Sequence, residues 1–217
     1  MGVRKIPHAG LSVRVLPGGM TVGFSRLALV GLIGLGACGT VEPPSPVSPR
    51  PASGDDEEAN RRGFDFELGA WRVHHRVKRP DGTWVEFDGT CTTRPVLGGA
   101  GNVEDHEFRR PSGVTRGLAL RSYDPTSKAW AIWWVDSRAP HGTMDPPMIG
   151  RFVGGVGTFF SDGLVDGVPT RTRFVWSNIT ATSARWEQAT STDGGARWSP
   201  NWTMDFVRVA YPATQIR

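Results

Sequence analysis

The chain has 217 residues, enough for one domain with appended segments, and its formal net charge is +4. The first 38 residues contain four basic residues and no acidic residue, which leaves 21 basic and 21 acidic residues in the rest of the chain. A balanced chain lacks the excess of positive charge that displaces counterions from nucleic acids, so the composition predicts no nucleic-acid partner.

The N-terminus predicts a secretion signal rather than a folded element. Residues 27–36 form an apolar run that follows an arginine, and ten residues at about 1.5 Å each are too few to cross a bilayer. The sequence Leu-Gly-Ala-Cys at residues 35–38 resembles the lipobox of bacterial lipoproteins, whose cysteine receives diacylglyceryl and palmitate groups. We therefore expect residues 1–37 to be a lipoprotein signal peptide, with Met20 as a possible true start, and Cys38 to carry the lipid. The alternative is a cleaved secretory signal in which Cys38 is incidental.

Residues 38–62 are expected to be the lipidated cysteine followed by a disordered tether. This stretch has five prolines between residues 43 and 51, an acidic run at 55–58, and almost no apolar side chains to bury. Gly39 stands where lipoproteins retained in the inner membrane resemble one another in carrying Asp, so we expect attachment to the outer membrane of a bacterial cell envelope, facing the periplasm. Cys91 is then the one remaining cysteine, which excludes an internal disulfide.

Beyond residue 63 the hydrophobic pattern has a period of two, and turn pairs such as Asp81-Gly82 recur about every eight to twelve positions. Short connections favour antiparallel neighbours, and closure of such a sheet removes its exposed edges. We therefore predict an all-β fold, an antiparallel up-and-down barrel of ten strands, over residues 63–209, with a C-terminal tail at 210–217. The predicted strands are 69–79, 83–93, 102–109, 116–123, 129–136, 148–153, 156–161, 170–177, 182–190 and 197–208.

The first and last strands indicate which side chains point inward. In the first strand Trp71, Val73 and His75 alternate with polar or charged neighbours, so His75 is expected inside the barrel. In the last strand Arg208 lies on the same face as three large apolar residues. An inward arginine needs a partner.

The sequence Leu-Gly-Ala-Trp at 68–71, together with Arg208, resembles the calycin pattern of lipocalins and fatty-acid-binding proteins. The resemblance implies that Gly69 and Trp71 open the barrel and that Arg208 packs across the Trp71 indole at the closed end. Residues 64–208 are also similar to an uncharacterised bacterial family of unknown function with a lipocalin-like barrel, which brings no established reaction. The segments that carry this similarity are FDFELGAWRVHHR, WVEFDGTC, RPVLGGAGNVED, DPTSKAWAIWWVDSR, SARWEQATSTDGGARW and NWTMDFVR.

Residues 191–198, STDGGARW, fit the Asp-box of sialidase-type propellers, a folding device that holds a hairpin turn. Propellers need several copies and this chain has one. We therefore expect Asp193 and Gly195 to support the hairpin between the last two strands, as structural residues.

No common catalytic, metal or cofactor motif is present. HExxH, Gly-x-Ser-x-Gly and P-loop sequences do not occur, and His74 and His75 face opposite sides of a strand, so they do not chelate one ion. Nitrobindins, haem-binding relatives of this barrel type, need a histidine on a late strand, and no histidine follows His141. We therefore predict no cofactor, no metal and no catalytic residue.

The leading functional hypothesis is a membrane-anchored envelope lipoprotein whose barrel binds a small hydrophobic or amphipathic ligand. Ten strands enclose an interior at the size where a ligand cavity is plausible. The longest connection, residues 137–148, is either a cover over the mouth or an ordered loop without a gating role. The predicted ligand-binding residues are His75, Arg121, Trp134, Asp136, Trp186 and Glu187.

Two alternatives stay open. One is an envelope scaffold with a filled barrel and an exposed aromatic patch. The other is an acid–base enzyme in which His75 meets Asp136 and Glu187. Because strands alternate, Asp136 faces inward if Trp134 does, whereas on the ninth strand either Trp186 or Glu187 faces inward.

Overall fold

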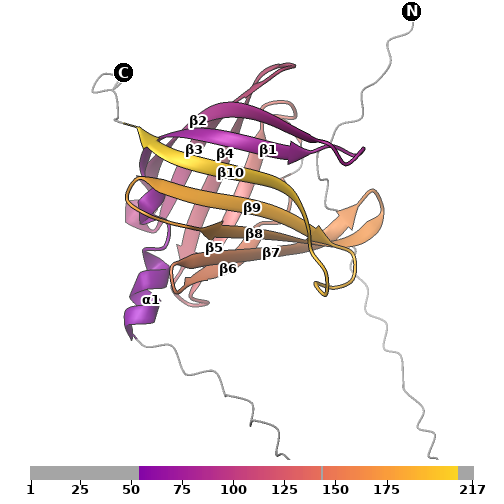
Figure 1. Ribbon diagram of the computed structural model, residues 1–217. Helices are drawn as coiled ribbons and strands as arrows, with labels where there is room; N and C mark the ends of the chain where they lie inside the picture. The colour runs from indigo at the N-terminus through magenta and orange to yellow at the C-terminus, as the bar shows by residue number, and fades with distance from the viewer. Residues whose placement is uncertain (1–53, 143, 210–217) are drawn as a thin grey trace, which may run out of the picture.

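The computed structural model describes residues 54–142 and 144–209, and these form a closed antiparallel barrel of ten strands (Figure 1). Each strand pairs with its neighbour in sequence, and β1 pairs with β10 to close the sheet. This confirms the predicted up-and-down barrel. The strands are β1 Gly69–Lys78, β2 Trp84–Val96, β3 Gly101–Arg110, β4 Gly113–Asp124, β5 Ala129–Asp136, β6 Met148–Val153, β7 Val156–Val165, β8 Val168–Ser177, β9 Ser183–Ser191 and β10 Ser199–Val209.

The turn residues account for the short connections. Gly154 and Gly155 join β6 to β7, and Asp166 and Gly167 join β7 to β8, in both cases with two consecutive positive φ angles. Two such residues twist a hairpin in the same sense as its strands, which a pair with negative φ does not. The longer connection between β9 and β10 is the predicted hairpin: Asp193 Oδ1 accepts hydrogen bonds from Ser191 Oγ at 2.8 Å and from the Arg197 amide at 2.9 Å.

One end of the barrel is sealed by the predicted pairing of Trp71 with Arg208. Trp71 is fully buried, and the Arg208 guanidinium carbon lies 4.1 Å from the centre of its ring. The same guanidinium donates hydrogen bonds to the carbonyl oxygens of Leu68 and Phe66. Gly69 has φ +109°, and a Cβ at this position would lie 3.0 Å from the arginine, so glycine allows the close approach. We refer to this end as the closed end.

The segment before the barrel differs from the predicted disordered tether. Within the described residues it forms helix α1, Gly54–Arg61, and the short 3-10 helix η1, Asp65–Glu67, instead of a disordered chain. Acidic residues fill the first turn of α1 and an arginine ends it, which suits the helix dipole. The folded unit therefore begins near residue 54. The predicted signal peptide 1–37, Cys38, the tether up to residue 53 and the tail 210–217 lie outside the described residues.

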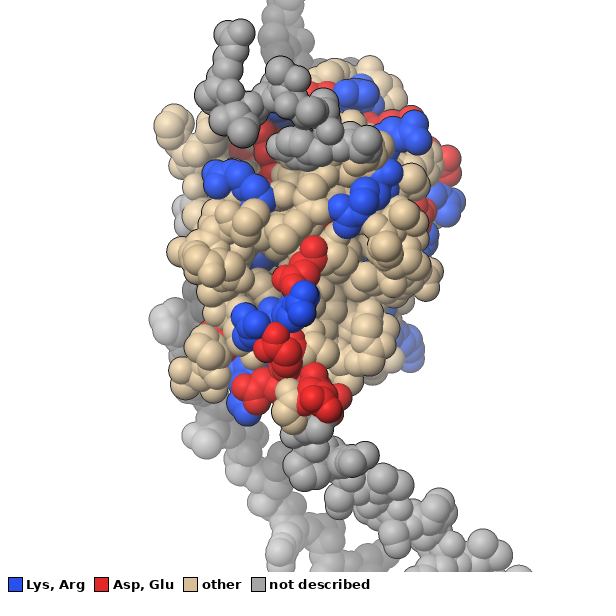
Figure 2. Space-filling view, turned by 90° about the vertical axis from the view of Figure 1, so that its left-hand side faces the viewer, with Lys and Arg blue, Asp and Glu red and all other residues tan. Residues whose placement is uncertain are grey.

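The face of the molecule shown in Figure 2 carries charged side chains of both signs. Figure 2 shows a band of alternating acidic and basic side chains that ends where the described chain begins, while most of the remaining surface of this face is uncharged. Within the described residues, no helix is long and apolar enough to span a membrane.

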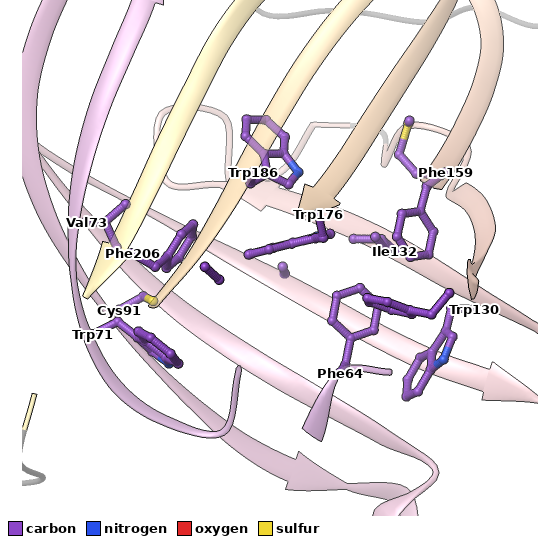
Figure 3. Close-up of a cluster of buried hydrophobic side chains, with 14 of the residues drawn as sticks. Phe64, Trp71, Val73, Cys91, Trp130, Ile132, Phe159, Trp176, Trp186 and Phe206 are labelled. Atoms are coloured by element: carbon purple, nitrogen blue, oxygen red, sulfur yellow. The ribbon is translucent and has the colours of Figure 1, made fainter. Parts of the chain in front are cut away.

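Aromatic side chains fill the closed half of the barrel (Figure 3). Phe64, between α1 and η1, enters this core, and its ring centre lies 4.8 Å from that of Phe152 and 5.0 Å from that of Trp130. The N-terminal segment thus acts as a plug. The largest fully buried apolar side chains are Trp71, Trp176, Phe64, Phe159, Phe206 and Val73.

Candidate functional site: a buried polar chain beneath an open barrel end

The two halves of the barrel interior differ in how completely they are packed. On β8 and β10 the inward side chains Trp176 and Phe206 are buried, whereas Phe174 and Met204, one inward position further along the barrel, are partly exposed. Trp202 is also partly exposed, and Trp134 has 39% of its surface accessible. A side chain that points into a closed barrel reaches water through the interior. These side chains make the half opposite the closed end partly accessible to solvent, although Thr170 and Thr172, further along the inward face of β8, are buried. We refer to this half as the open end.

A chain of five polar side chains crosses the buried interior. It consists of Glu67 from η1, Arg121 from β4, Glu104 and His106 from β3, and His75 from β1, and all five are at most 3% exposed. Four of these groups occupy inward positions of β1, β3 and β4, so the sheet brings them together, and Glu67 joins them from η1.

The acidic part of this chain is centred on Arg121. Its guanidinium lies 2.7 Å from Glu67 Oε2, donates to Glu104 Oε2, and donates to Asn102 Oδ1 at 3.1 Å. A buried charge is tolerated when it is paired and hydrogen-bonded, and these partners meet that condition for Arg121.

The histidine part continues from Glu104 toward the open end. His106 Nδ1 lies 2.5 Å from Glu104 Oε1, and His106 Nε2 lies 3.2 Å from His75 Nε2. The Trp202 indole N–H donates to His75 Nδ1 at 3.3 Å, which makes this nitrogen an acceptor. One arrangement of protons then satisfies these contacts: His75 Nε2–H donates to His106 Nε2, and His106 Nδ1–H donates to Glu104.

The pKa values of the buried histidine and the two buried glutamates are set by burial and by nearby charges. Burial, together with His106 and Arg110, lowers the pKa of His75 to about 2, so this imidazole is neutral. Burial opposes ionisation of Glu104, but the Arg121 charge and the hydrogen bond from His106 outweigh it and lower its pKa. Burial raises the pKa of Glu67 well above its usual value, and the nearby Glu104 charge acts in the same direction. Arg121 and Glu104 therefore form one buried ion pair, with Glu67 protonated beside it.

A glycine makes room for the histidine pair. A Cβ at Gly89 would lie 2.8 Å from His75 Nε2, 3.3 Å from His106 Nε2 and 2.5 Å from the Glu107 carbonyl oxygen. Every other side chain at this position of β2 would separate the two rings or displace the neighbouring strand.

Within the described chain, three buried residues could supply ligand atoms to a metal ion: Cys91, Glu104 and His106. One potential ligand atom of each lies within 4.8 Å of those of the other two. Two ligands of one tetrahedral ion at about 2.0–2.1 Å are more than 3 Å apart, whereas the closest nitrogen and oxygen of His106 and Glu104 are 2.5 Å apart, a hydrogen-bond distance. Burial also raises the pKa of the Cys91 thiol, which keeps it protonated. The arrangement shown is that of a hydrogen-bonded network rather than of a ligand set.

The structure places five of the six predicted ligand-binding residues on the inner face. His75, Arg121 and Trp186 are buried there, and Trp134 and Asp136 follow the inward register of β5 toward the open end. Glu187 is on the outer face, so its inclusion was wrong.

The position of Glu187 also removes the predicted catalytic trio. On β9 the inward residues are Trp186 and Gln188, and Glu187 pairs outside the barrel with Arg173 at 3.4 Å. Asp136 is bound by Arg138 through both carboxylate oxygens, which, against the effect of burial, lowers the pKa of Asp136. His75, Asp136 and Glu187 therefore do not form one acid–base site.

The sequence reasoning missed Glu67, Glu104, His106 and Arg110. Glu104, His106 and Arg110 share the inward face of β3, at the spacing of two that marks one face of a strand. The signal was present but ambiguous, because the opposite face of the same strand also carries acidic and basic residues.

A surface hollow of about 420 Å³ lies outside the barrel. It is lined by Leu120, Trp133, Met144, Asp145, Pro146 and Pro147. Leu120 and Trp133 face outward from β4 and β5, so the described second part of the 137–148 loop covers the outer wall rather than the mouth. The barrel wall separates this hollow from the inward polar chain, and the partly exposed interior is the better candidate for a ligand site.

These features define the class: a closed ten-stranded β-barrel with one sealed end, one solvent-accessible end and a buried polar chain between them. Residues 57–149 match the model of a family described as protein of unknown function (DUF1579), a description that assigns no reaction. No curated protein matches the chain.

Several solved structures are similar to this chain at low sequence identity. The S-type phycobiliprotein lyase CPES from Guillardia theta is 10% identical with a TM-score of 0.49, over 73% of this chain and 97% of the lyase. Rv2717c from M. tuberculosis is 11% identical with a TM-score of 0.47, over 68% and 98% of the two chains. A de novo designed fluorescence-activating β-barrel is 12% identical with a TM-score of 0.37, over 68% and 97%.

Proposed function

We propose that this protein is a membrane-anchored lipoprotein of the bacterial cell envelope whose barrel binds a small hydrophobic or amphipathic ligand at its open end. The observation that carries the binding proposal is the partial exposure of the inward side chains Phe174, Trp202, Met204 and Trp134. The anchor proposal rests on the lipobox-like sequence that ends in Cys38.

The energetic argument for a ligand is that apolar side chains inside the barrel remain in contact with water. Each square ångström of apolar surface removed from water contributes about 25 cal/mol, so a ligand that covers several partly exposed aromatic rings gains a substantial driving force. A pre-formed barrel adds to this because its walls are already ordered before the ligand binds.

The scaffold alternative predicts a filled barrel, which does not fit these partly exposed inward side chains. The enzyme alternative loses its carboxylates, because Glu187 points outward and Asp136 is held by Arg138. Ligand binding is therefore the function that the geometry supports best.

The test uses the full chain with Cys38→Ser, a substitution that removes the proposed lipid. In this background, two adjacent tryptophans are substituted one at a time. Trp134 faces the interior, whereas Trp133 faces outward and lines the surface hollow. With the neutral fluorescent probe N-phenyl-1-naphthylamine, we expect saturable binding that Trp134→Ala weakens about tenfold, the effect of about 1.4 kcal/mol. Trp133→Ala should leave the affinity unchanged.

Two results would contradict the proposal. The reverse pattern would place the site in the outer hollow, and an absence of saturable binding to all three proteins would remove the binding function. Thermal denaturation followed by circular dichroism verifies that both variants are folded.

A further inference from the structure

Arg110 is an inward-facing arginine at the open end that has a different environment from the other two inward arginines. It is the last residue of β3 and is partly buried. Its guanidinium carbon lies 4.6 Å from the ring centre of Phe87, 5.2 Å from that of Phe108 and 5.7 Å from that of Trp202. The cation is thus held against three aromatic rings beside the partly exposed interior.

The hydrogen-bonding capacity of this guanidinium is not used up. Arg110 Nε is buried and has no hydrogen-bond partner among the described residues, and no carboxylate of the described chain lies within 4 Å of its nitrogens. Arg121 Nε is likewise buried without a hydrogen-bond partner, but other nitrogens of Arg121 contact two carboxyl groups, and Arg208 donates to three backbone carbonyls. A guanidinium has five N–H donors, and leaving them unpaired in a partly dry site is unfavourable.

The charged groups that act on Arg110 are one acidic and one basic residue, Asp136 and Arg138. Asp136 is the acidic group that acts on Arg110, but it is already engaged by Arg138 through two hydrogen bonds from separate nitrogens. Two arginines against one aspartate leave an excess of one positive charge. Burial and the Arg138 charge both lower the pKa of Arg110, and the Asp136 charge opposes them without outweighing them.

We propose that Arg110 binds the acidic head group of the ligand, so that the open end takes an amphipathic carboxylate. A planar carboxylate matches the guanidinium fork with two parallel hydrogen bonds. The apolar part of the ligand then lies against Trp134, Phe174 and Met204. This inference rests on the proposed ligand-binding function and specifies the chemistry of its ligand.

The test compares two probes of equal chain length that differ in the head group: dodecanoate and dodecanol, each displacing N-phenyl-1-naphthylamine from the full chain carrying Cys38→Ser. Arg110→Gln removes the charge, and Arg110→Lys keeps the charge without the fork. The matched control is Arg109→Gln, because Arg109 is adjacent on β3 but points outward and pairs with Glu107 at 2.9 Å.

We expect Arg110→Gln to weaken dodecanoate binding at least tenfold and to leave dodecanol binding unchanged. Arg110→Lys should give an intermediate loss, and Arg109→Gln should match the parent protein. In the parent protein, dodecanoate affinity should also fall as salt concentration rises, because a charge pair is screened.

The outcomes separate the two levels of the proposal. Equal dodecanoate affinity in the parent protein and in Arg110→Gln would overturn the role of Arg110 while the binding function stands. Absence of saturable dye binding to every one of these proteins would overturn both, whereas failure of dodecanoate to displace a saturably bound dye from the parent protein would overturn the carboxylate ligand alone. Arg110→Lys, with its charge retained, covers the case in which Arg110→Gln does not fold.

Discussion

His74 and His75 show how a single step along a strand changes the chemistry of an imidazole. His74 points outward, where Asp88 accepts a hydrogen bond at 3.0 Å, and this contact raises the pKa of His74. His75 points inward, and burial lowers its pKa to about 2. The same residue type therefore has opposite shifts at adjacent positions, because strand neighbours lie on opposite faces of the sheet.

These two pKa shifts predict distinct NMR titrations. The ring resonances of His74 should titrate with a midpoint above 6.5, whereas those of His75 should show no titration between pH 8 and pH 4 and should keep the tautomer protonated at Nε2. The folded state does not protonate His75 where the unfolded state does, so protonation favours unfolding. Its contribution to stability is complete above pH 6.5 and decreases as the pH falls toward 2.

His75→Gln is the control that isolates this contribution. Between pH 6 and pH 4, the free energy of unfolding of the wild type should fall relative to the variant by about 1.4 kcal/mol per pH unit, the slope for one proton. Parallel pH dependences of wild type and variant, measured by urea denaturation, would contradict the assignment.

At the scale of elements, the N-terminal segment is attached to the barrel through Asn60. Its side-chain oxygen accepts from the Phe152 amide at 2.8 Å, and its side-chain nitrogen donates to the Lys128 carbonyl at 2.8 Å. The Asn60 carbonyl also accepts from the Trp130 indole at 2.8 Å. One residue of α1 therefore bridges β5, β6 and the turn before β5.

Removal of this side chain should weaken the barrel. Asn60→Ala leaves the buried Phe152 amide without its acceptor, and we expect a loss of about 1–3 kcal/mol in the free energy of unfolding. Arg61→Ala is the matched control: Arg61 is exposed and pairs with Glu58 three residues earlier, so its loss should leave the free energy of unfolding nearly unchanged. Chemical denaturation of the two variants checks this, and equal effects would show that Asn60 does not anchor the segment.

Helix α1 also shows a limit of prediction from local sequence patterns. The proline-rich sequence before α1 and its acidic run indicate a solvated chain, and three of the four acidic residues of α1, Asp55, Asp56 and Glu58, are exposed. Asn60 and Phe64 become buried because the closed end of the barrel receives them. The partners that order this helix lie roughly seventy to ninety residues away in sequence, and no local pattern contains them.

At the scale of the whole molecule, the proposed anchor places the barrel on a membrane. We expect the wild-type chain to fractionate with bacterial membranes and Cys38→Ser to move to the soluble fraction, because a substituted residue cannot carry the lipid. Cys91→Ser is the control, since Cys91 is buried in the barrel, and this variant should remain with the membranes. Unchanged fractionation of Cys38→Ser would contradict the lipid anchor.

The sequence by itself determined the number of strands, the barrel and the inward position of His75, and its resemblance to the calycin pattern implied the pairing of Trp71 with Arg208. The strands, and with them the face on which His75 lies, follow from local features, the period of two and the turn residues between strands. The Asp-box hairpin was predictable for the same reason, since its hydrogen bonds connect residues at most four positions apart.

The tertiary structure alone decided which polar groups meet and which end of the barrel is open. Glu67, Glu104 and Arg121 come from separate elements, and their contacts depend on strand register and on the entry of the N-terminal segment into the barrel. Glu187 faces outward although its spacing allowed either face, because the larger apolar gain comes from burying Trp186 on the inner side. Long-range packing selects among the alternatives that a period of two leaves equivalent.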